Sequence, residues 1–318
     1  MARERSAWRT WQRQPQKLKL RRLLFQVHRW TAISLGLYIG FISLSGSVLV
    51  YRNELYVAAT PEPILSTGPG PILSDQELSA AAERTHPGYS IRRLHRPSNP
   101  EQAVVIWLAR DDTLRKRLFD PRSGEDVGQA TPLGMTLITG LMELHADFLS
   151  GSTGRTLNGV VAFGVLLILL TGLVIWWPGI KRWRRSLVVH RGIGWKRQVW
   201  DIHSMIGIWS YAFMLTFVVS GLYLCFAPAF HAVADWLQPV TDENAGTRLV
   251  DRVLYWLAFL HFGRINGIGI PCDGPGLCDQ TTKAVWALFG LAPAIMIATG
   301  ATMWWNRLRG RRKRAQDD

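Results

Sequence analysis

The stretch Thr171–Trp177 (TGLVIWW) ends a long apolar run, and its pattern returns with the same spacing at Thr299–Trp305 (TGATMWW). In both copies a long apolar run precedes the Thr-Gly pair, and a cluster of Lys and Arg follows the Trp pair. Tryptophan is enriched at membrane–water interfaces, so a Trp pair between apolar and basic residues is typical of the end of a membrane span. The repeat therefore indicates two equivalent membrane helices.

A second repeat connects the other two long apolar runs. His28 precedes the pair Ser45-Gly46 by seventeen residues, and His203 precedes Ser220-Gly221 by the same seventeen. Together the two repeats predict a duplicated pair of membrane helices in which a histidine marks each opening helix.

Length and composition agree with a membrane protein. The 318 residues are 48% hydrophobic and include 15 Trp, and the apolar residues are concentrated in blocks. About 20 apolar residues cross a bilayer. Four segments meet this requirement, namely Trp30–Tyr51, Leu157–Trp177, Ile206–Phe226 and Ala284–Trp305.

The net charge of +14 could suggest a nucleic-acid-binding protein, but its distribution favours a membrane orientation. Segments 1–27, 179–200 and 306–318 hold 21 of the 37 Lys and Arg and only 3 of the 23 acids. An even number of spans places these three segments on one side, and the positive-inside rule assigns that side to the cytoplasm. We therefore expect a multi-pass protein of the bacterial inner membrane with both termini cytoplasmic and no nucleic-acid partner.

The expected fold is an α-helical integral membrane protein with four transmembrane helices, arranged as two repeated helix pairs, and a small α+β extracytoplasmic insertion. Its segments are 1–27 (basic, cytoplasmic), 28–51 (first span), 52–132 (periplasmic module), 133–178 (outer helix and second span), 179–200 (basic loop), 201–227 (third span), 228–283 (periplasmic connection), 284–305 (fourth span) and 306–318 (basic tail).

The periplasmic module has its own local signals. Residues 52–73 are rich in Pro and Gly and predict a linker, and Ser74-Asp75-Gln76-Glu77 is a capping box that opens a helix to about Thr85. Residues 103–109 are β-rich, and 117–120 and 125–128 flank a Pro-Arg-Ser-Gly turn. This order of elements resembles the PepSY module.

The second outer connection contains two of the three cysteines. Cys272 and Cys278 flank a turn-rich loop in an oxidising compartment, so the spacing makes a local disulfide plausible, with metal binding as the weaker alternative. Residues 229–256 are expected to be partly helical, and 133–149 to form an apolar helix carrying His145.

Four of the eight histidines stand at comparable edges of the predicted spans. His28 and His203 lie at the inner ends of the first and third spans, and His145 and His261 lie just before the second and fourth. Histidine is a leading ligand of haem iron, and a bis-histidine haem b needs imidazoles from two neighbouring helices. We therefore expect two haems, one held by His28 and His203 on the inner side and one by His145 and His261 on the outer side. Interfacial histidines without a cofactor are the simpler alternative.

The remaining candidate features have plainer interpretations. The pairs Ser45-Gly46, Thr171-Gly172, Ser220-Gly221 and Thr299-Gly300 predict close packing between spans, with contact to a haem face as the alternative. Surface positions are expected for the other histidines, His86, His95, His190 and His231. Nucleotide, hydrolase and flavin-domain motifs are missing, so an electron donor would be a separate reductase, a quinol or a small reductant.

Taken together, these motifs carry a family resemblance. His28-Arg29-Trp30, Leu144-His145, Asp201-Ile202-His203 and Leu260-His261-Phe262-Gly263, with the Thr-Gly and Trp-Trp repeats, resemble the PepSY-associated transmembrane proteins. That family includes iron-regulated inner-membrane proteins and ferric-siderophore reductases.

The resemblance implies an oxidoreductase that reduces Fe(III) in a siderophore or other ferric chelate to Fe(II) on the periplasmic side, with haem relaying the electron. Its partners would be membrane lipid, the ferric chelate and the separate donor. A non-redox PepSY protein that binds or regulates a periplasmic protease is the alternative, and a transporter subunit is a third possibility.

Overall fold

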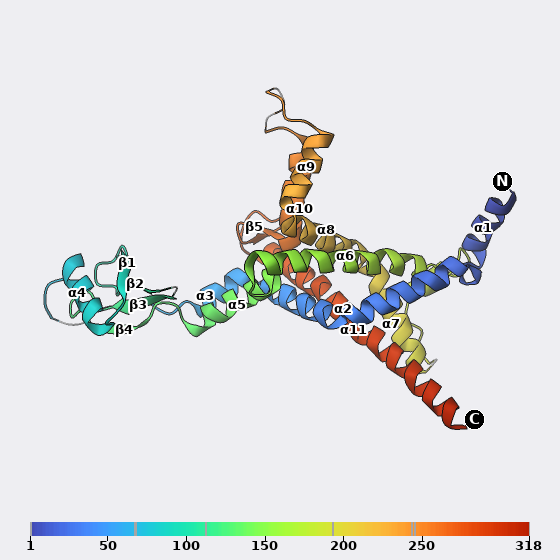
Figure 1. Ribbon diagram of the computed structural model, residues 1–318, viewed down its shortest axis with the longest axis horizontal. Helices are drawn as coiled ribbons and strands as arrows, with labels where there is room; N and C mark the ends of the chain where they lie inside the picture. The colour runs from blue at the N-terminus through green and yellow to red at the C-terminus, as the bar shows by residue number, and fades with distance from the viewer. Residues whose placement is uncertain are drawn as a thin grey trace. The chain divides into compact units, whose positions relative to one another are not determined.

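The long apolar runs form helices in the computed structural model of this chain (Figure 1). It describes residues 2–66, 69–111, 113–192, 194–242, 244 and 246–317, with side chains between residues 8 and 310. Within the described residues, three helices are long and apolar enough to cross a membrane: α2 (Lys19–Leu49), α6 (Gly151–Trp176), and the Leu277–Gly310 part of α11 (Leu277–Asp317). The predicted spans at both ends of the chain and the second span are thereby confirmed as helices. The side chains of residues 1–7 and 311–318, which belong to the predicted basic cytoplasmic segments, lie outside the described residues.

The predicted third span, Ile206–Phe226, is not one continuous helix. It is divided between α7 (Trp195–Trp209) and α8 (Tyr211–Cys225), which meet at 61°. The Oγ of the buried Ser210 at the junction donates to the carbonyl of Ile206 at 2.6 Å, and such back-bonding bends helices. The structure therefore has three apolar spans, or four if this bent pair counts as one.

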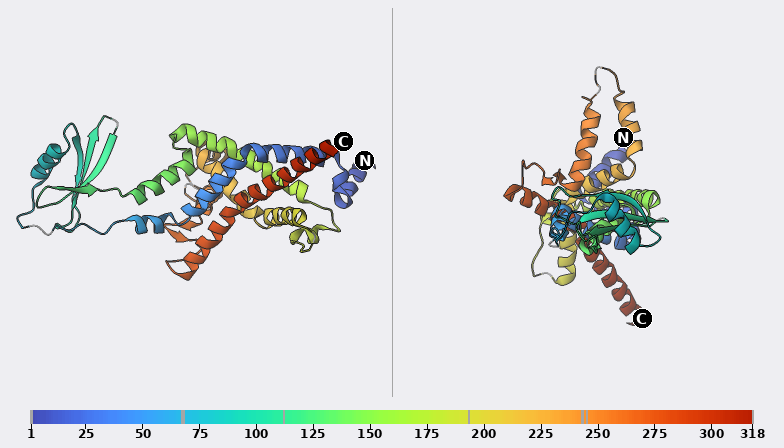
Figure 2. Two further views of the ribbon diagram at one scale, coloured as in Figure 1. Left: turned by 90° about the horizontal axis from the view of Figure 1, so that it is seen from below. Right: turned by 90° about the vertical axis from the view of Figure 1, so that its left-hand side faces the viewer.

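These helices pack into a helical unit made of residues 1–51 and 141–318. Helix α2 lies against α6 and α11, α6 packs on α8, and α7 packs on α11 (Figure 2). Small residues permit the closest approach, as predicted for the first span: Ser43 Oγ donates to the Gly290 carbonyl at 2.5 Å and accepts from the Ala294 N–H at 3.1 Å. A Cβ at Gly290 would stand 2.6 Å from Ser47 Oγ, so this crossing requires glycine.

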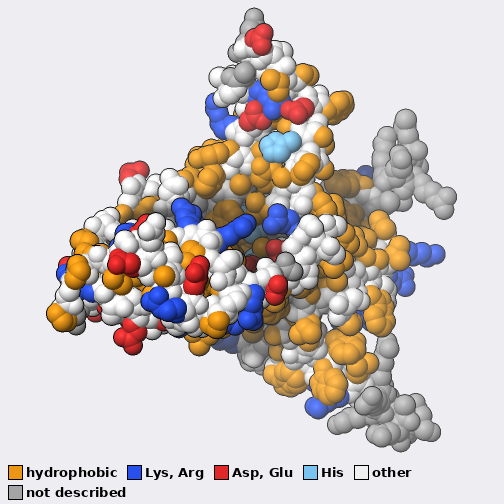
Figure 3. All heavy atoms as spheres, turned by 60° about the vertical axis from the view of Figure 1, so that its left-hand side comes forward, with side chains coloured by type: hydrophobic (Ala, Val, Ile, Leu, Met, Phe, Trp, Pro, Cys, Tyr) orange, Lys and Arg blue, Asp and Glu red, His pale blue; other side chains and the backbone are white. Residues whose placement is uncertain are grey.

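Apolar side chains also cover the outside of the helical unit. Leu37 on α2 is 91% exposed and Leu277 at the start of α11 is 86% exposed. Figure 3 shows hydrophobic side chains gathered over the helices, whereas charges of both signs are scattered over the other unit. A surface of this kind is compatible with lipid and not with water.

Residues 52–140 form the second compact unit, slightly longer than the predicted module 52–132. It begins with helix α3 (Arg52–Ala59), so the linker predicted for residues 52–73 is partly helical. The reason is local, because Pro and Gly are missing from Arg52–Ala59 and begin only at Pro61. Its last helix, α5 (Leu133–Asp147), continues into the helical unit and carries His145, as predicted.

A four-stranded sheet with one helix forms the centre of this second unit. Helix α4 (Asp75–Thr85) has the predicted capping box between Ser74 and Glu77. Four antiparallel strands follow in order, β1 (Ser90–His95), β2 (Val104–Arg110), β3 (Thr113–Phe119) and β4 (Asp126–Gln129). Leu78 and Ala82 of α4 pack on Val104, Ile106, Leu108 and Phe119. Strand β1 was not predicted, because its polar residues give no clear alternation.

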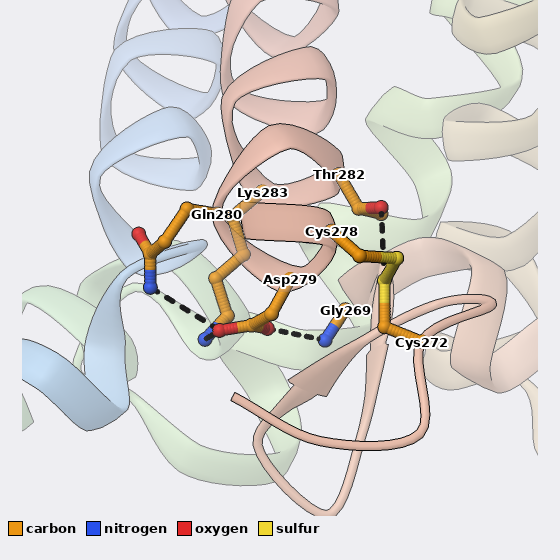
Figure 4. Close-up of a disulfide and its surroundings, with 7 residues drawn as sticks. All are labelled: Gly269, Cys272, Cys278, Asp279, Gln280, Thr282 and Lys283. Carbon is orange, nitrogen blue, oxygen red and sulfur yellow. Dashed lines mark hydrogen bonds and ion pairs between the residues drawn. A yellow bond between two sulfur atoms is a disulfide. The ribbon is translucent and has the colours of Figure 1, made fainter. Parts of the chain in front are cut away.

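The second outer connection contains two helices and a small hairpin. These are α9 (Ala227–Leu237), α10 (Leu249–Phe262), β5 (Arg264–Ile265) and β6 (Ile268–Gly269). Cys272 and Cys278 form the disulfide that the sequence suggested, and Asp279 beside it accepts from the Gly269 N–H and from Lys283 (Figure 4). The short elements α1 (Ala2–Arg13), η1 (Pro15–Lys17) and η2 (Trp183–Leu187) complete the fold.

Candidate cofactor site

The four predicted histidines all lie in the helical unit. His28 is on α2, His203 on α7, His145 in the last turn of α5 and His261 in the last turn of α10. Each ring is partly or wholly withdrawn from the surface and points at a neighbouring helix. The contacts on those neighbours follow one rule.

Every one of these histidines places Nδ1 against the hydroxyl of a Ser-Gly or Thr-Gly pair. The contacts are His28 with Thr171 at 3.2 Å, His145 with Ser45 at 2.9 Å, His203 with Thr299 at 2.9 Å, and His261 with Ser220 at 2.8 Å. The pairs that the sequence suggested as general packing sites are therefore specific partners of the histidines.

These hydroxyls have already used their own proton. Each donates to the carbonyl four residues earlier in its helix, as from Thr171 to Leu167 at 2.7 Å and from Ser45 to Phe41 at 2.9 Å. Ser220 and Thr299 do the same toward Thr216 and Ile295. A hydroxyl has one proton, so toward the histidine it must accept.

A second contact fixes the same proton independently. His28 Nδ1 lies 3.0 Å from the Ile168 carbonyl, three residues before Thr171. Since a carbonyl only accepts, Nδ1 of His28 carries the proton, and the matching hydroxyl contacts of His145, His203 and His261 give those rings the same arrangement. Nε2 of each ring then keeps its lone pair for a ligand.

The glycine of each pair makes room for the ring that its neighbour holds. A Cβ at Gly46 would lie 2.9 Å from His145 Cε1, and one at Gly172 would lie 3.2 Å from His28 Cε1. At Gly300 and Gly221 the distances to His203 and His261 would be 3.6 and 3.7 Å. The Ser/Thr-Gly pair therefore acts as a seat for an imidazole, most tightly at Gly46.

His145 and His261 come together as the sequence predicted for the outer pair. Their ring centroids are 6.5 Å apart with an interplanar angle of 55°. A metal ion bonded ~2 Å from two imidazole nitrogens, with each ring centre about 1 Å beyond, would separate the centres by roughly 6 Å. The observed spacing thus leaves room for one metal ion between the rings. His28 and His203, the inner pair, lie on α2 and α7, which both pack on α11.

The two pairs are well separated along the bundle. Ser45, the partner of His145, follows His28 by seventeen residues on α2. At 1.5 Å per residue this is about 25 Å, a large part of the ~30 Å apolar core of a bilayer. The helical unit can therefore hold one group near each face of a membrane.

The donor set favours a macrocycle over a bare metal ion. Within the described part of the chain, no three His, Cys, Asp or Glu side chains come close enough to hold a metal ion together. Protein zinc sites use three or four such ligands, whereas haem iron, already bound by the macrocycle, would need only one or two ligands from the protein. Near the inner pair, Arg21 Nε, Arg29 Nε, Trp176 Nε1 and Ser204 Oγ are buried with no partner among the described atoms. Unpartnered buried polar atoms fit a polar group that is absent from the chain itself.

Comparison with known proteins identifies the family of the chain. The description "PepSY-associated TM region" matches residues 25–243 and 227–307, which include all four histidines and all the apolar helices. The chain belongs to this family. It is also 32% identical over 84 residues to the uncharacterized protein PA4219 of Pseudomonas aeruginosa, a match covering 26% of this chain and 20% of that protein. The chain thus aligns with only a fifth of that relative's length.

The other histidines of this PepSY-associated membrane protein are not all plain surface residues. His86 Nε2 lies 2.6 Å from Asp126, and His190 lies 3.1 Å from the buried Asp201. The His190 side chain is 37% exposed, as expected for a surface residue, whereas that of His86 is 18% exposed and pairs with an acid forty residues further along the chain. His95 is exposed, and His231 has only a 3.5 Å contact with Tyr223.

One supporting residue escaped the sequence reasoning. Asn158 of α6 donates to the backbone carbonyls of His145 and Ala146 at 2.9 and 3.0 Å, and Tyr38 of α2 donates to its Oδ1. An amide in an apolar run was the available signal, since such a group needs partners inside a membrane. These bonds tie the end of α5 to α2 and α6.

Proposed function

We propose that this PepSY-associated membrane protein is a haem-containing electron-transfer protein that reduces ferric siderophore or another ferric chelate on the periplasmic side. It would hold two b-type haems, one between His28 and His203 and one between His145 and His261. The charge distribution of the sequence supports a bacterial inner-membrane location with cytoplasmic termini.

The observation that carries the proposal is the shared proton arrangement of the four histidines. Each Nδ1–H donates to a hydroxyl, and that of His28 also donates to a carbonyl, so each Nε2 is left as a lone-pair donor. An interfacial histidine without a ligand has no need of this arrangement in four copies. A hydrogen bond at the far nitrogen is the usual support of a metal-bound histidine, because it fixes the tautomer and ring orientation.

Haem iron, when bound, supplies a one-electron carrier. The chain's own residues orient the four imidazoles, exclude water through the surrounding apolar helices, and separate the two pairs by about 25 Å along α2. A separate donor, a quinol or a reductase, would deliver electrons at the inner pair. The outer pair would face the chelate.

The reduction releases iron for a simple reason. Fe(II) has a lower charge and is a softer ion than Fe(III), so the hard oxygen ligands typical of siderophores hold it less tightly. The family resemblance supports this substrate class.

The first test is the haem content of the detergent-purified protein, measured by the pyridine haemochrome method. We expect about two b-type haems per chain. His28→Ala or His203→Ala should leave one, His145→Ala or His261→Ala should leave the other, and the exposed His95→Ala should leave both. Absence of haem in the unmodified protein, expressed with ample haem, would overturn the proposal in favour of a PepSY protein that binds a periplasmic partner.

A second measurement addresses the substrate. The dithionite-reduced protein, freed of excess reductant, should be reoxidised by a ferric hydroxamate or catecholate with release of Fe(II) to a ferrous chelator. Loss of the outer haem in His261→Ala should slow this reoxidation at least tenfold. An unchanged rate would contradict the outer pair as the donor to the chelate.

A further inference from the structure

A small cavity lies at the inner end of the helical unit, outside the contacts described so far. Its volume is about 190 Å³, and it is lined by Gln16, Arg21, Arg22, Phe25, Gln26 and Ile175. Two arginines and two glutamines give it many hydrogen-bond donors. None of these lining residues is acidic, so the cavity suits an anionic group.

The cavity is aligned with the inner histidine. Arg21 and His28 are seven residues apart on α2, which places them on one face about 10 Å apart along the axis. Their partners on α6 keep the same interval, because Arg21 donates to the Ile175 carbonyl and His28 Nδ1 to that of Ile168. The guanidinium therefore lies two turns toward the cytoplasmic end from the imidazole, along one groove between α2 and α6.

Arg21 still needs an acceptor. Its Nη2 is bonded to Ile175, whereas its Nε is buried with no partner among the described atoms. A buried guanidinium without a counter-charge is costly. Carboxylates and phosphates are the oxyanions that a guanidinium binds in bidentate fashion.

The basic pair belongs to the duplication. Arg21-Arg22 precede His28 by seven and six residues, and Lys196-Arg197 precede His203 by the same intervals. Lys196 is exposed, and Arg197 pairs with Asp201 at 2.9 Å. Each inner ligand thus has two cations at a fixed offset, of which Arg21 is the half-buried one with an open donor.

We infer that this cavity binds a propionate carboxylate of the inner haem, with Arg21 as its main partner and Arg22 in support. This inference rests on the proposed haem site. The propionates are the only charged groups at the edge of haem b, and inside an apolar bundle they require compensating cations. The shared face of Arg21 and His28 places such a cation two helical turns from the iron ligand, on the cytoplasmic side. A phospholipid phosphate could use the same chemistry, so the test must separate the two.

The experiment changes the arginine and the haem propionates separately and together, and it measures the affinity for haem in each case. His145→Ala/His261→Ala protein, made without haem, offers only the inner site, and it is titrated in detergent with haem b and with haem b dimethyl ester, which lacks the propionate charges. We expect the ester to bind at least tenfold more weakly than haem b. Arg21→Gln should weaken the binding of haem b by a similar factor, and this variant should bind haem b and the ester equally well. Arg21→Lys should restore part of the difference.

The matched control replaces Arg184, an exposed arginine of the cytoplasmic loop. Arg184→Gln should keep the full preference for haem b over the ester. In the otherwise unchanged chain, Arg21→Gln should retain the outer haem, which shows that it folds. Full preference for haem b in Arg21→Gln would overturn the inference. Two results together would also overturn it. These are retention of phosphatidylglycerol that depends on Arg21, seen by native mass spectrometry, and equal binding of haem b and its ester by the inner site with Arg21 present. Failure of the starting protein to bind any haem would instead overturn the proposed function.

Discussion

At the scale of single residues, the Ser/Thr-Gly pair is the unit that explains the site. The hydroxyl accepts from Nδ1 while it donates backward into its own helix, and the glycine admits Cε1 of the same ring. Both residues are small because an imidazole has to lie directly on the helix backbone. The four pairs differ in how closely the ring approaches, and this difference can be tested.

Substituting Gly46 should disturb the outer pair more than substituting Gly221. An added Cβ would stand 2.9 Å from His145 Cε1 in the first case and 3.7 Å from His261 Cε1 in the second. We expect Gly46→Ala to cost about 1–3 kcal/mol through overpacking and to lower the occupancy of the outer haem. Gly221→Ala should bind haem normally, and equal losses in the two variants, measured by haem content, would contradict the ring positions.

Removing one hydroxyl should change the electronic character of its histidine without removing the ligand. Ser220→Ala takes one acceptor from the Nδ1–H of His261, which lowers the basicity of the imidazole and its preference for Fe(III). The outer midpoint potential should rise by some tens of millivolts, where 59 mV is a tenfold change for one electron. Thr216→Ala, one turn earlier in the same helix, removes a hydroxyl that donates to the Ala212 carbonyl instead, and it should leave the potential unchanged in a spectroelectrochemical titration. Identical potentials in both variants would argue against the contact.

At the scale of elements, two local devices shape the helices and the sheet. The back-bonded Ser210 separates α7 from α8, so α7 can pack on α11 while α8 packs on α6 and α10.

In the other unit, a buried cluster connects the end of α4 to the last two strands. Asp126 of β4 accepts from Arg117 of β3 at 2.8 Å and contacts His86 at 2.6 Å.

This cluster predicts an acid-sensitive sheet. Burial by itself would raise the pKa of Asp126, but hydrogen bonds from Arg117, His86 and the Gly128 N–H outweigh burial and lower this pKa. A lowered folded-state pKa contributes stability that is fully present above the ordinary carboxyl pKa of about 4, and this contribution is lost as the pH falls from there through the lowered folded-state pKa. Hydrogen exchange of peptides from β3 and β4 in the full-length protein should therefore accelerate below about pH 4.

Asp126→Asn should remove this pH dependence and cost about 2 kcal/mol at neutral pH, because a charged acceptor is lost. The exposed pair of Arg96 and Asp75 provides the control, since Asp75→Asn should cost less than about 1 kcal/mol. A pH dependence that persists in Asp126→Asn would assign it to another group.

At the scale of the whole molecule, the two halves of the duplication have two different relations to the histidines. Each histidine is held by a hydroxyl of its own half, as His28 is by Thr171 and His203 by Thr299. Each pair, however, takes one ring from each half, as in His145 with His261. Either half can therefore orient its histidines, but in the proposed function only both halves together would supply the two ligands of one haem.

The orientation of the chain in the membrane gives a prediction at this scale. In a chain with Cys225 replaced by Ser, a cysteine at Ser98 should react with an impermeant maleimide in intact spheroplasts, because residues 52–132 are expected outside. A cysteine at Arg191, in the basic loop 179–200, should react only after the membrane is opened. Labelling of both positions in intact spheroplasts, or the reverse pattern, would contradict cytoplasmic termini.

The sequence alone determined the membrane character, the helix repeat, the capping box of α4 and the four histidines, because apolar length, spacing and cap chemistry are local properties. It also placed His145 with His261, since the repeat left few ways to pair equivalent positions. Only the tertiary structure decided which hydroxyl holds each ring, that Nδ1 carries the proton, and that Arg21, whose Nε has no partner among the described atoms, lines a cavity at the inner end of the helical unit. The physical reason is that hydrogen-bond direction depends on atoms from helices far apart in the chain, which no spacing along one helix can specify.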